Sequence, residues 1–178
     1  MLLAGVKSFD MSPRQGVELA GYPHYPRHNT GVHDPLYASC LYLRSGGFEL
    51  AFVTLDILFF SKKYVRRVRE RAHARCGIEP GHVMICCSHT HSGPWASGRL
   101  DMEALTGGNA APDAAYVYFL TDGMVQLICD AKRDAFEASL GVGAGVCGAE
   151  RGVGGNRRIK GGVSDPTVGV IAVRDRDG

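Results

Sequence analysis

A βαβ pattern in the first half of the chain constrains the fold more than any other feature. Residues 48–55 and 82–87 are apolar runs with strong strand character. Residues 61–76 between them show helical periodicity, with Ser61 at the start and Gly77 just past the end. This order is typical of two parallel strands joined by a right-handed crossover. The carboxyl ends of both strands should therefore meet at one edge of a sheet.

Further strands and a second helix extend this unit. The turn Arg44-Ser45-Gly46-Gly47 predicts a hairpin that joins residues 36–43 to residues 48–55. The other predicted elements are strands at residues 2–9, 140–147 and 167–173 and a long helix at residues 113–139. We expect an α/β fold, a mixed sheet with a βαβ unit flanked by two main helices.

Composition narrows the class of protein. A chain of 178 residues with 45% apolar and 21% charged residues suits one soluble domain with a substantial core. The helix at residues 61–76 carries a basic face, but a net charge of only +2 favours a solvated surface over nucleic-acid binding. None of the six cysteines forms a Cys-x-x-Cys pair, which predicts buried thiols in a reducing compartment.

The first residues suggest no targeting segment. Residues 1–5 lack the basic and apolar regions of a signal peptide, and no apolar run approaches the roughly 18 residues that a membrane span needs. We therefore expect a cytoplasmic protein without a transmembrane segment.

Two histidines separated by one residue follow the second strand of the βαβ unit. If the extended conformation persists from Cys87 to His91, the imidazoles of His89 and His91 point to the same face. Such a pair at a strand end favours a metal or catalytic site, although two nearby histidines can also simply hold a loop. The spacing fits neither the His-x-His-x-Asp-His pattern of dinuclear hydrolases nor the His-Glu-x-x-His zincin helix.

Two other segments are candidates for the same site. Asp56 follows the first strand of the βαβ unit, so parallel topology places it beside the histidines, where it can support them, cap the turn at Ser61 or hold a loop. Residues 14–34 form a long loop that contains Gly21, and its tyrosines, prolines and histidines fit a binding loop or a passive one.

The final residues resemble the start of a hairpin. Asp177-Gly178 follows the strand at residues 167–173, and we expect its returning partner to be missing, as in a truncated portion of a longer protein. An unpaired strand edge tends to recruit another chain, so the sequence predicts a possible oligomer.

Several motifs occur in an order that resembles a known family. They are Ala20-Gly21-Tyr22, Gly31 to Ala38 (Gly-Val-His-Asp-Pro-Leu-Tyr-Ala), Thr54-Leu55-Asp56, Ser88 to Pro94 (Ser-His-Thr-His-Ser-Gly-Pro) and Gly155-Asn156-Arg157. Together they resemble the amino-terminal domain of the neutral/alkaline non-lysosomal ceramidases, zinc-dependent amidases that hydrolyse N-acylsphingosine. The resemblance implies that residues 1–178 are the N-terminal portion of a larger α/β hydrolase-type catalytic domain.

The resemblance also implies site residues. His89 matches the zinc-binding histidine, His91 the second active-site histidine, and Arg157 an arginine that contacts the reacting centre. The cofactor would be Zn²⁺ and the substrate an N-acyl lipid or another N-acyl compound. The family's other zinc ligands would lie beyond Gly178, so we expect the isolated chain to be inactive.

With fewer ligands than a closed zinc site, the chain would bind zinc weakly or borrow His24, His33 or Asp56 in compensation. The alternative is a noncatalytic metal- or ligand-binding module on the same fold, in which the histidine pair holds a loop or a surface metal.

Overall fold

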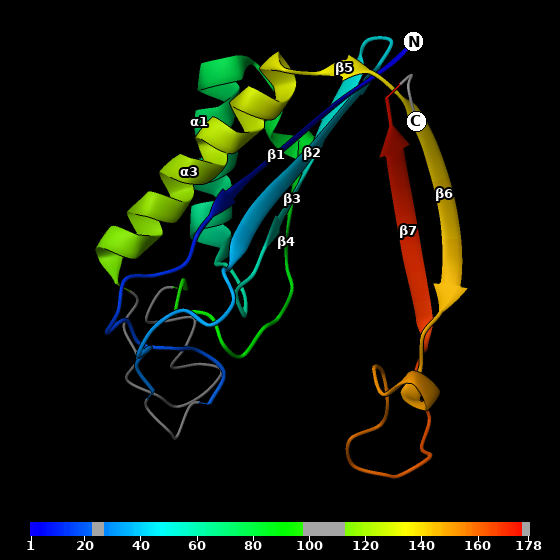
Figure 1. Ribbon diagram of the computed structural model, residues 1–178. Helices are drawn as coiled ribbons and strands as arrows, with labels where there is room; N and C mark the ends of the chain where they lie inside the picture. The colour runs from blue at the N-terminus through cyan, green and yellow to red at the C-terminus, as the bar shows by residue number, and fades with distance from the viewer. Residues whose placement is uncertain (23–26, 98–112, 176–178) are drawn as a thin grey trace. The chain divides into compact units, whose positions relative to one another are not determined.

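The computed structural model describes residues 1–22, 27–97 and 113–175, which form two compact units, Met1–Phe136 and Glu137–Gly178. Five strands form a sheet of order β4-β3-β2-β1-β5 (Figure 1). They are β1 (Leu2–Asp10), β2 (Tyr37–Ser45), β3 (Phe48–Leu55), β4 (Val83–Cys87) and the short β5 (Phe136–Glu137), and only Glu137 belongs to the second unit. The β1/β2 and β2/β3 pairs are antiparallel and the β3/β4 pair is parallel, which confirms the predicted mixed sheet.

The crossover between β3 and β4 is the predicted helix, α1 (Lys62–Cys76), followed by the short 3-10 helix η1 (Pro80–His82). Ser61 occupies the N-cap position, although its side chain makes no capping hydrogen bond. Gly77 ends the helix in the left-handed region, at φ 74°, and its N–H donates to the carbonyl of His73. The βαβ prediction is therefore confirmed, including the parallel pairing.

The second helix is shorter than the sequence predicted. α3 (Ala114–Arg133) begins where Asp113 accepts hydrogen bonds from the backbone N–H groups of Ala115 and Tyr116, at 2.9 and 3.2 Å. It ends at Arg133 and not at residue 139, because the chain there enters β5 and takes its backbone partners from the sheet. Basic residues in the last turn, Lys132 and Arg133, suit the negative end of the helix dipole.

Both helices lie on one face of the sheet and enclose the core (Figure 1). The largest fully buried side chains there include Tyr42, Val53, Leu120, Met124 and Ile128. Helix α3 approaches β1 so closely that a Cβ on Gly5 would lie 1.8 Å from the carbonyl oxygen of Ala131. Only glycine permits this distance between strand and helix. Within the described residues, no helix has both the length and the apolar character that crossing a bilayer requires.

The second unit is a two-stranded antiparallel ribbon of β6 (Ser139–Val146) and β7 (Thr167–Arg174), connected through η2 (Ala149–Arg151). The two strands pair along their whole length, from Ser139 opposite Arg174 to Val146 opposite Thr167. Strand β7 therefore has one partner, β6, which precedes it in the sequence, whereas the missing strand expected to return after Gly178 stays a prediction. An oligomer formed through a strand edge stays a prediction.

Candidate functional site

The loops that follow β3 and β4 meet at one edge of the sheet, as parallel pairing requires. The N–H of Ser88 donates to the carbonyl of Leu55 at 2.9 Å, and the N–H of His89 donates to the carbonyl of Ile57 at 3.1 Å. The segment that carries the histidine pair is thus bound to the segment that follows β3. This edge is where open α/β sheets usually bind their ligands.

His89 turns the chain in a way that the sequence did not predict. Strand β4 ends at Cys87, and His89 has a left-handed backbone with φ 61°. The chain is therefore not extended up to His91, which was the condition for both imidazoles to point to the same face of the strand. For a residue with a side chain, the left-handed region costs about 1–2 kcal/mol. Such strain persists where surrounding contacts enforce it, and it is common at functional sites.

The His89 ring is oriented by a backbone carbonyl. Its Nδ1 lies 2.9 Å from the carbonyl oxygen of Leu58. Because a carbonyl only accepts hydrogen bonds, we assign a proton to Nδ1, and in the neutral imidazole this leaves Nε2 with a free lone pair. Histidines that bind metals usually have their second nitrogen fixed in this manner. The His89 side chain therefore fits a metal ligand.

The two imidazoles are neighbours in spite of the turn between them. The ring centroids of His89 and His91 lie 5.3 Å apart, with the ring planes at 73°. The ring of Tyr22 approaches His91 edge-on, at 5.5 Å between centroids. Gly21 has φ 106°, and a Cβ there would lie 2.6 Å from Cγ of His91. Gly21, which the motif pattern assigned to the site, thus lies directly against the second histidine.

The loop before β2 packs onto the segment that carries the histidines. The N–H of Ala20 donates to the carbonyl of Gly93 at 2.8 Å, and the N–H of Trp95 donates to the carbonyl of Glu18 at 3.2 Å. Ala20, Trp95 and Leu58 form a small buried cluster at this contact. Leu58 therefore supports the site twice, through its side chain in the cluster and its carbonyl at the His89 ring.

Arg27 joins the same two segments. Its Nη2 donates to the carbonyls of Ala20 and His91, at 2.9 and 2.5 Å, and its guanidinium lies 4.4 Å over the ring of Tyr22. Sequence reasoning missed the roles of Arg27, Tyr22 and Leu58. For Arg27 and Tyr22 the signals were the composition of the loop, which fitted a binding loop or a passive one, and the motif Ala20-Gly21-Tyr22. No pattern in the sequence pointed to Leu58.

Asp56 and His33 have other partners. The Asp56 carboxylate accepts a hydrogen bond from the N–H of Tyr37 at 3.0 Å, so it holds the start of β2, one of the alternatives left open by the sequence. His33 is exposed, with Nδ1 2.8 Å from the Asp34 carboxylate. No group of three potential metal ligands occurs among the described residues, so neither residue completes a metal site with His89 there. His24 lies outside the described residues.

Arg157 belongs to the second unit. It is exposed, and it follows Asn156, whose side-chain oxygen accepts hydrogen bonds from the N–H groups of Arg158 and Ile159, both at 3.0 Å. The local turn is therefore well defined. A role for Arg157 at the reacting centre stays a prediction.

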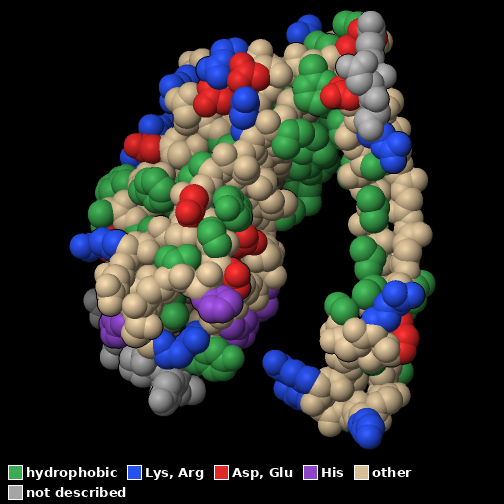
Figure 2. Space-filling model, in the orientation of Figure 1, with side chains coloured by type: hydrophobic (Ala, Val, Ile, Leu, Met, Phe, Trp, Pro, Cys, Tyr) green, Lys and Arg blue, Asp and Glu red, His purple; other side chains and the backbone are tan. Residues whose placement is uncertain are grey.

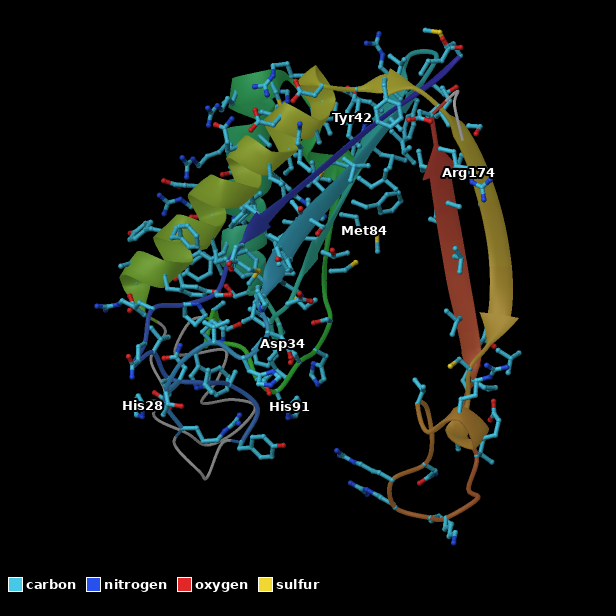
Figure 3. The ribbon with its side chains drawn as sticks, viewed as in Figure 1. His28, Asp34, Tyr42, Met84, His91 and Arg174 are labelled. Carbon is cyan, nitrogen blue, oxygen red and sulfur yellow. The ribbon has the colours of Figure 1, made fainter. Side chains whose placement is uncertain are left out.

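A concavity of about 480 Å³ lies beside the histidine turn. Its lining includes Thr90 and Ser92 from that turn and His28, His33 and Asp34 from the preceding loop, but neither His89 nor His91. Figure 3 shows His28, Asp34 and His91 at the same end of the first unit, and histidine side chains gather on the surface there in Figure 2. The concavity therefore adjoins the imidazole pair and is separate from it.

The thiol at the end of β4 differs chemically from the imidazoles. Burial raises the pKa of Cys87 to about 11, with a further contribution from neighbouring Cys86. All six cysteines are free thiols. At neutral pH the Cys87 thiol is therefore protonated.

Comparison with known proteins identifies solved structures with a similar fold. No protein-family model and no curated protein sequence matches the chain. The crystal structure of neutral ceramidase from Pseudomonas aeruginosa matches 99% of the chain with a TM-score of 0.81 and 22% sequence identity. A second structure, of ceramidase complexed with C2, matches 99% of the chain with a TM-score of 0.76 and 22% identity. The chain spans only 30% and 29% of those two proteins. The resemblance expected from the motifs is confirmed at the level of the fold: the chain has the mixed α/β fold of a portion of neutral ceramidase.

Proposed function

We propose that the chain is part of a zinc-dependent amide hydrolase of the neutral ceramidase type, which cleaves N-acylsphingosine to sphingosine and a fatty acid. The observation that carries the proposal is the hydrogen bond of 2.9 Å between Nδ1 of His89 and the carbonyl of Leu58, which leaves Nε2 free to bind a metal. The fold likeness to neutral ceramidase supports it.

Hydrolysis of an amide needs a strong nucleophile and a stabilised oxyanion. Bound zinc supplies both, because it acidifies water and polarises a carbonyl. His89 would hold the ion through Nε2. Other ligands would come from outside the described residues, since these contain no group of three candidates.

His91 is proposed to move the proton or to orient the attacking water. Its ring centroid lies 5.3 Å from that of His89, so the two imidazoles could act on the same substrate or water. Arg157 is proposed to stabilise the negative charge that develops on the carbonyl oxygen. The assignment of Arg157 rests on the motif Gly155-Asn156-Arg157 alone.

The test compares the 178-residue chain with the complete gene product. Both are assayed for release of fatty acid from N-acylsphingosine and from a short N-acyl amine, with and without added Zn²⁺. We expect hydrolysis by the complete protein and little or none by the chain, which spans 30% of the solved ceramidase. A complete protein that binds zinc through His89 without hydrolysing either substrate would favour a noncatalytic metal-binding module.

A further inference from the structure

We propose that Arg27 is a positioning residue for His91, and the inference rests on the proposed function of that histidine. Arg27 lies 64 positions before His91 in the sequence, yet its Nη2 donates to the His91 carbonyl oxygen at 2.5 Å. The same nitrogen donates to the carbonyl of Ala20 at 2.9 Å. Hydrogen bonds from a charged donor are stronger than neutral ones, so Arg27 fixes the main chain of both segments.

The guanidinium also fixes a side chain that touches His91. It lies 4.4 Å over the ring of Tyr22, a distance at which a cation is attracted to the ring face. The Tyr22 ring in turn meets the His91 ring edge-on, at 5.5 Å and 80°. Arg27 therefore acts on His91 by two routes, directly through its carbonyl and indirectly through Tyr22.

These contacts define the direction of the His91 ring. Gly21 packs against one side of the His91 ring, so closely that a Cβ at position 21 would lie 2.6 Å from Cγ of His91. The rings of Tyr22 and His89 also lie next to the His91 ring, at 5.5 and 5.3 Å between centroids. Because Gly21 and Tyr22 lie on the segment that Arg27 binds, loss of Arg27 should loosen this enclosure.

Arginine is the residue type that this position needs. A planar guanidinium can donate in its plane and stack on a ring with its face. A lysine ammonium at position 27 can donate to a carbonyl, but it cannot stack as a plane. Arg27→Lys should therefore retain part of the effect, and Arg27→Met should lose all of it while keeping a long side chain.

The first experiment measures how accessible the His91 ring is, without using activity. The purified chain and its variants react with diethyl pyrocarbonate, and peptide mass spectrometry gives the modification rate of each histidine. In Arg27→Met we expect His91 to react several-fold faster, in Arg27→Lys to a smaller extent, and His33 to be unchanged because it is already exposed. Arg14→Met is the matched control, since Arg14 is 79% exposed and its guanidinium binds the Asp113 carboxylate at 2.9 Å.

An unchanged His91 rate in Arg27→Met would overturn the proposal. If that variant unfolds, His82, whose Nδ1 is buried, will also react faster. Arg27→Lys then decides: a rate increase confined to His91 supports positioning, and no increase refutes it. These outcomes do not depend on which reaction the protein catalyses.

The second experiment uses the complete gene product. For a positioning role we expect Arg27→Met to lower kcat by about tenfold to a hundredfold, with KM and zinc content nearly unchanged. Equal losses in Arg27→Met and Arg14→Met would show a general effect on the fold and contradict positioning. If the wild-type protein hydrolyses no N-acyl substrate, the proposed function fails, while the modification rates still test the placement of His91.

Discussion

The ring of His91 occupies the space that any side chain at position 21 would need, because a Cβ on Gly21 would lie 2.6 Å from its Cγ. The residues are 70 positions apart in the sequence, and the contact forms only when the loop before β2 packs on the turn after β4. Gly21→Ala should therefore displace the His91 ring. In the complete protein we expect kcat to fall by about tenfold or more, because small displacements of catalytic groups are costly.

Gly16→Ala is the control for this substitution. Gly16 also has a positive φ, 87°, but a Cβ there would meet no atom within 4 Å. Both variants should lose about 1 kcal/mol of unfolding free energy through backbone strain, as measured by urea denaturation. Only Gly21→Ala should also lose activity, and equal activity in the two variants would show that the His91 contact does not matter.

His89→Asn should remove zinc and preserve the fold. Asparagine tolerates the left-handed backbone of position 89, where φ is 61°, and its amide can donate to the Leu58 carbonyl as Nδ1 now does. It has no counterpart of Nε2. Metal analysis of the complete protein should show loss of zinc, with unfolding free energy within about 1 kcal/mol of wild type. Stoichiometric zinc in the variant would exclude His89 as a ligand.

Glu49→Gln should destabilise the packing of α3 on the β2/β3 hairpin. The Glu49 carboxylate accepts hydrogen bonds from the Tyr42 hydroxyl and from Nζ of Lys132, the latter at 2.8 Å. Burial alone would raise the pKa of Glu49, but these two partners lower it below its usual range. We expect a loss of roughly 1–3 kcal/mol in urea denaturation, since the amide weakens both hydrogen bonds and leaves Lys132 without a counter-charge. An unchanged denaturation midpoint would contradict this role.

Stability should fall in acid partly through Asp113. Hydrogen bonds from Arg14, and from the backbone N–H groups of Tyr116 and Ala115, hold the pKa of Asp113 below its usual range. A carboxyl with a lowered pKa stabilises the fold above its unfolded-state pKa of about 3.9, and this contribution is lost as pH falls through the folded-state value. Thermal unfolding from pH 6 to about pH 2.5 should therefore show a smaller decline in Asp113→Asn than in wild type. Asparagine is the suitable replacement because it still caps the helix. Parallel curves for the two proteins would contradict this role.

Local patterns in the sequence predicted most of the fold. The hairpin between residues 36–43 and 48–55 and the start of a helix near residue 113 are local signals, and each appears where the sequence indicated. The end of α3 was placed six residues too late, since Arg133 rather than residue 139 ends the helix. The helical spacing of apolar residues continues beyond Arg133. The helix nevertheless ends there, because β5 pairs with β1 in the sheet, and this pairing cannot be read from local spacing.

The candidate site was predictable in its residues and not in its geometry. Strand topology brought the ends of β3 and β4 together, but the left-handed turn at His89 depends on the carbonyls of Ile57 and Leu58, which no pattern reveals. The contact of Gly21 with His91 is likewise tertiary. Topology predicted the position of Asp56 at this edge of the sheet, but it did not predict the partner of its carboxylate, which is the backbone N–H of Tyr37.

The parallel pairing of β3 with β4 also has a kinetic consequence. Strands β2 and β3 are joined by a tight turn with Gly46 at φ 59°, so their contacts are local and can form early. His89 reaches the carbonyl of Leu58 only after the chain has passed through α1 and β4 has joined β3. We therefore expect substitutions around His89 to accelerate unfolding and to leave the refolding rate nearly unchanged, as for contacts absent from the transition state. The histidine turn would then be one of the first parts of the molecule to open and one of the last to close.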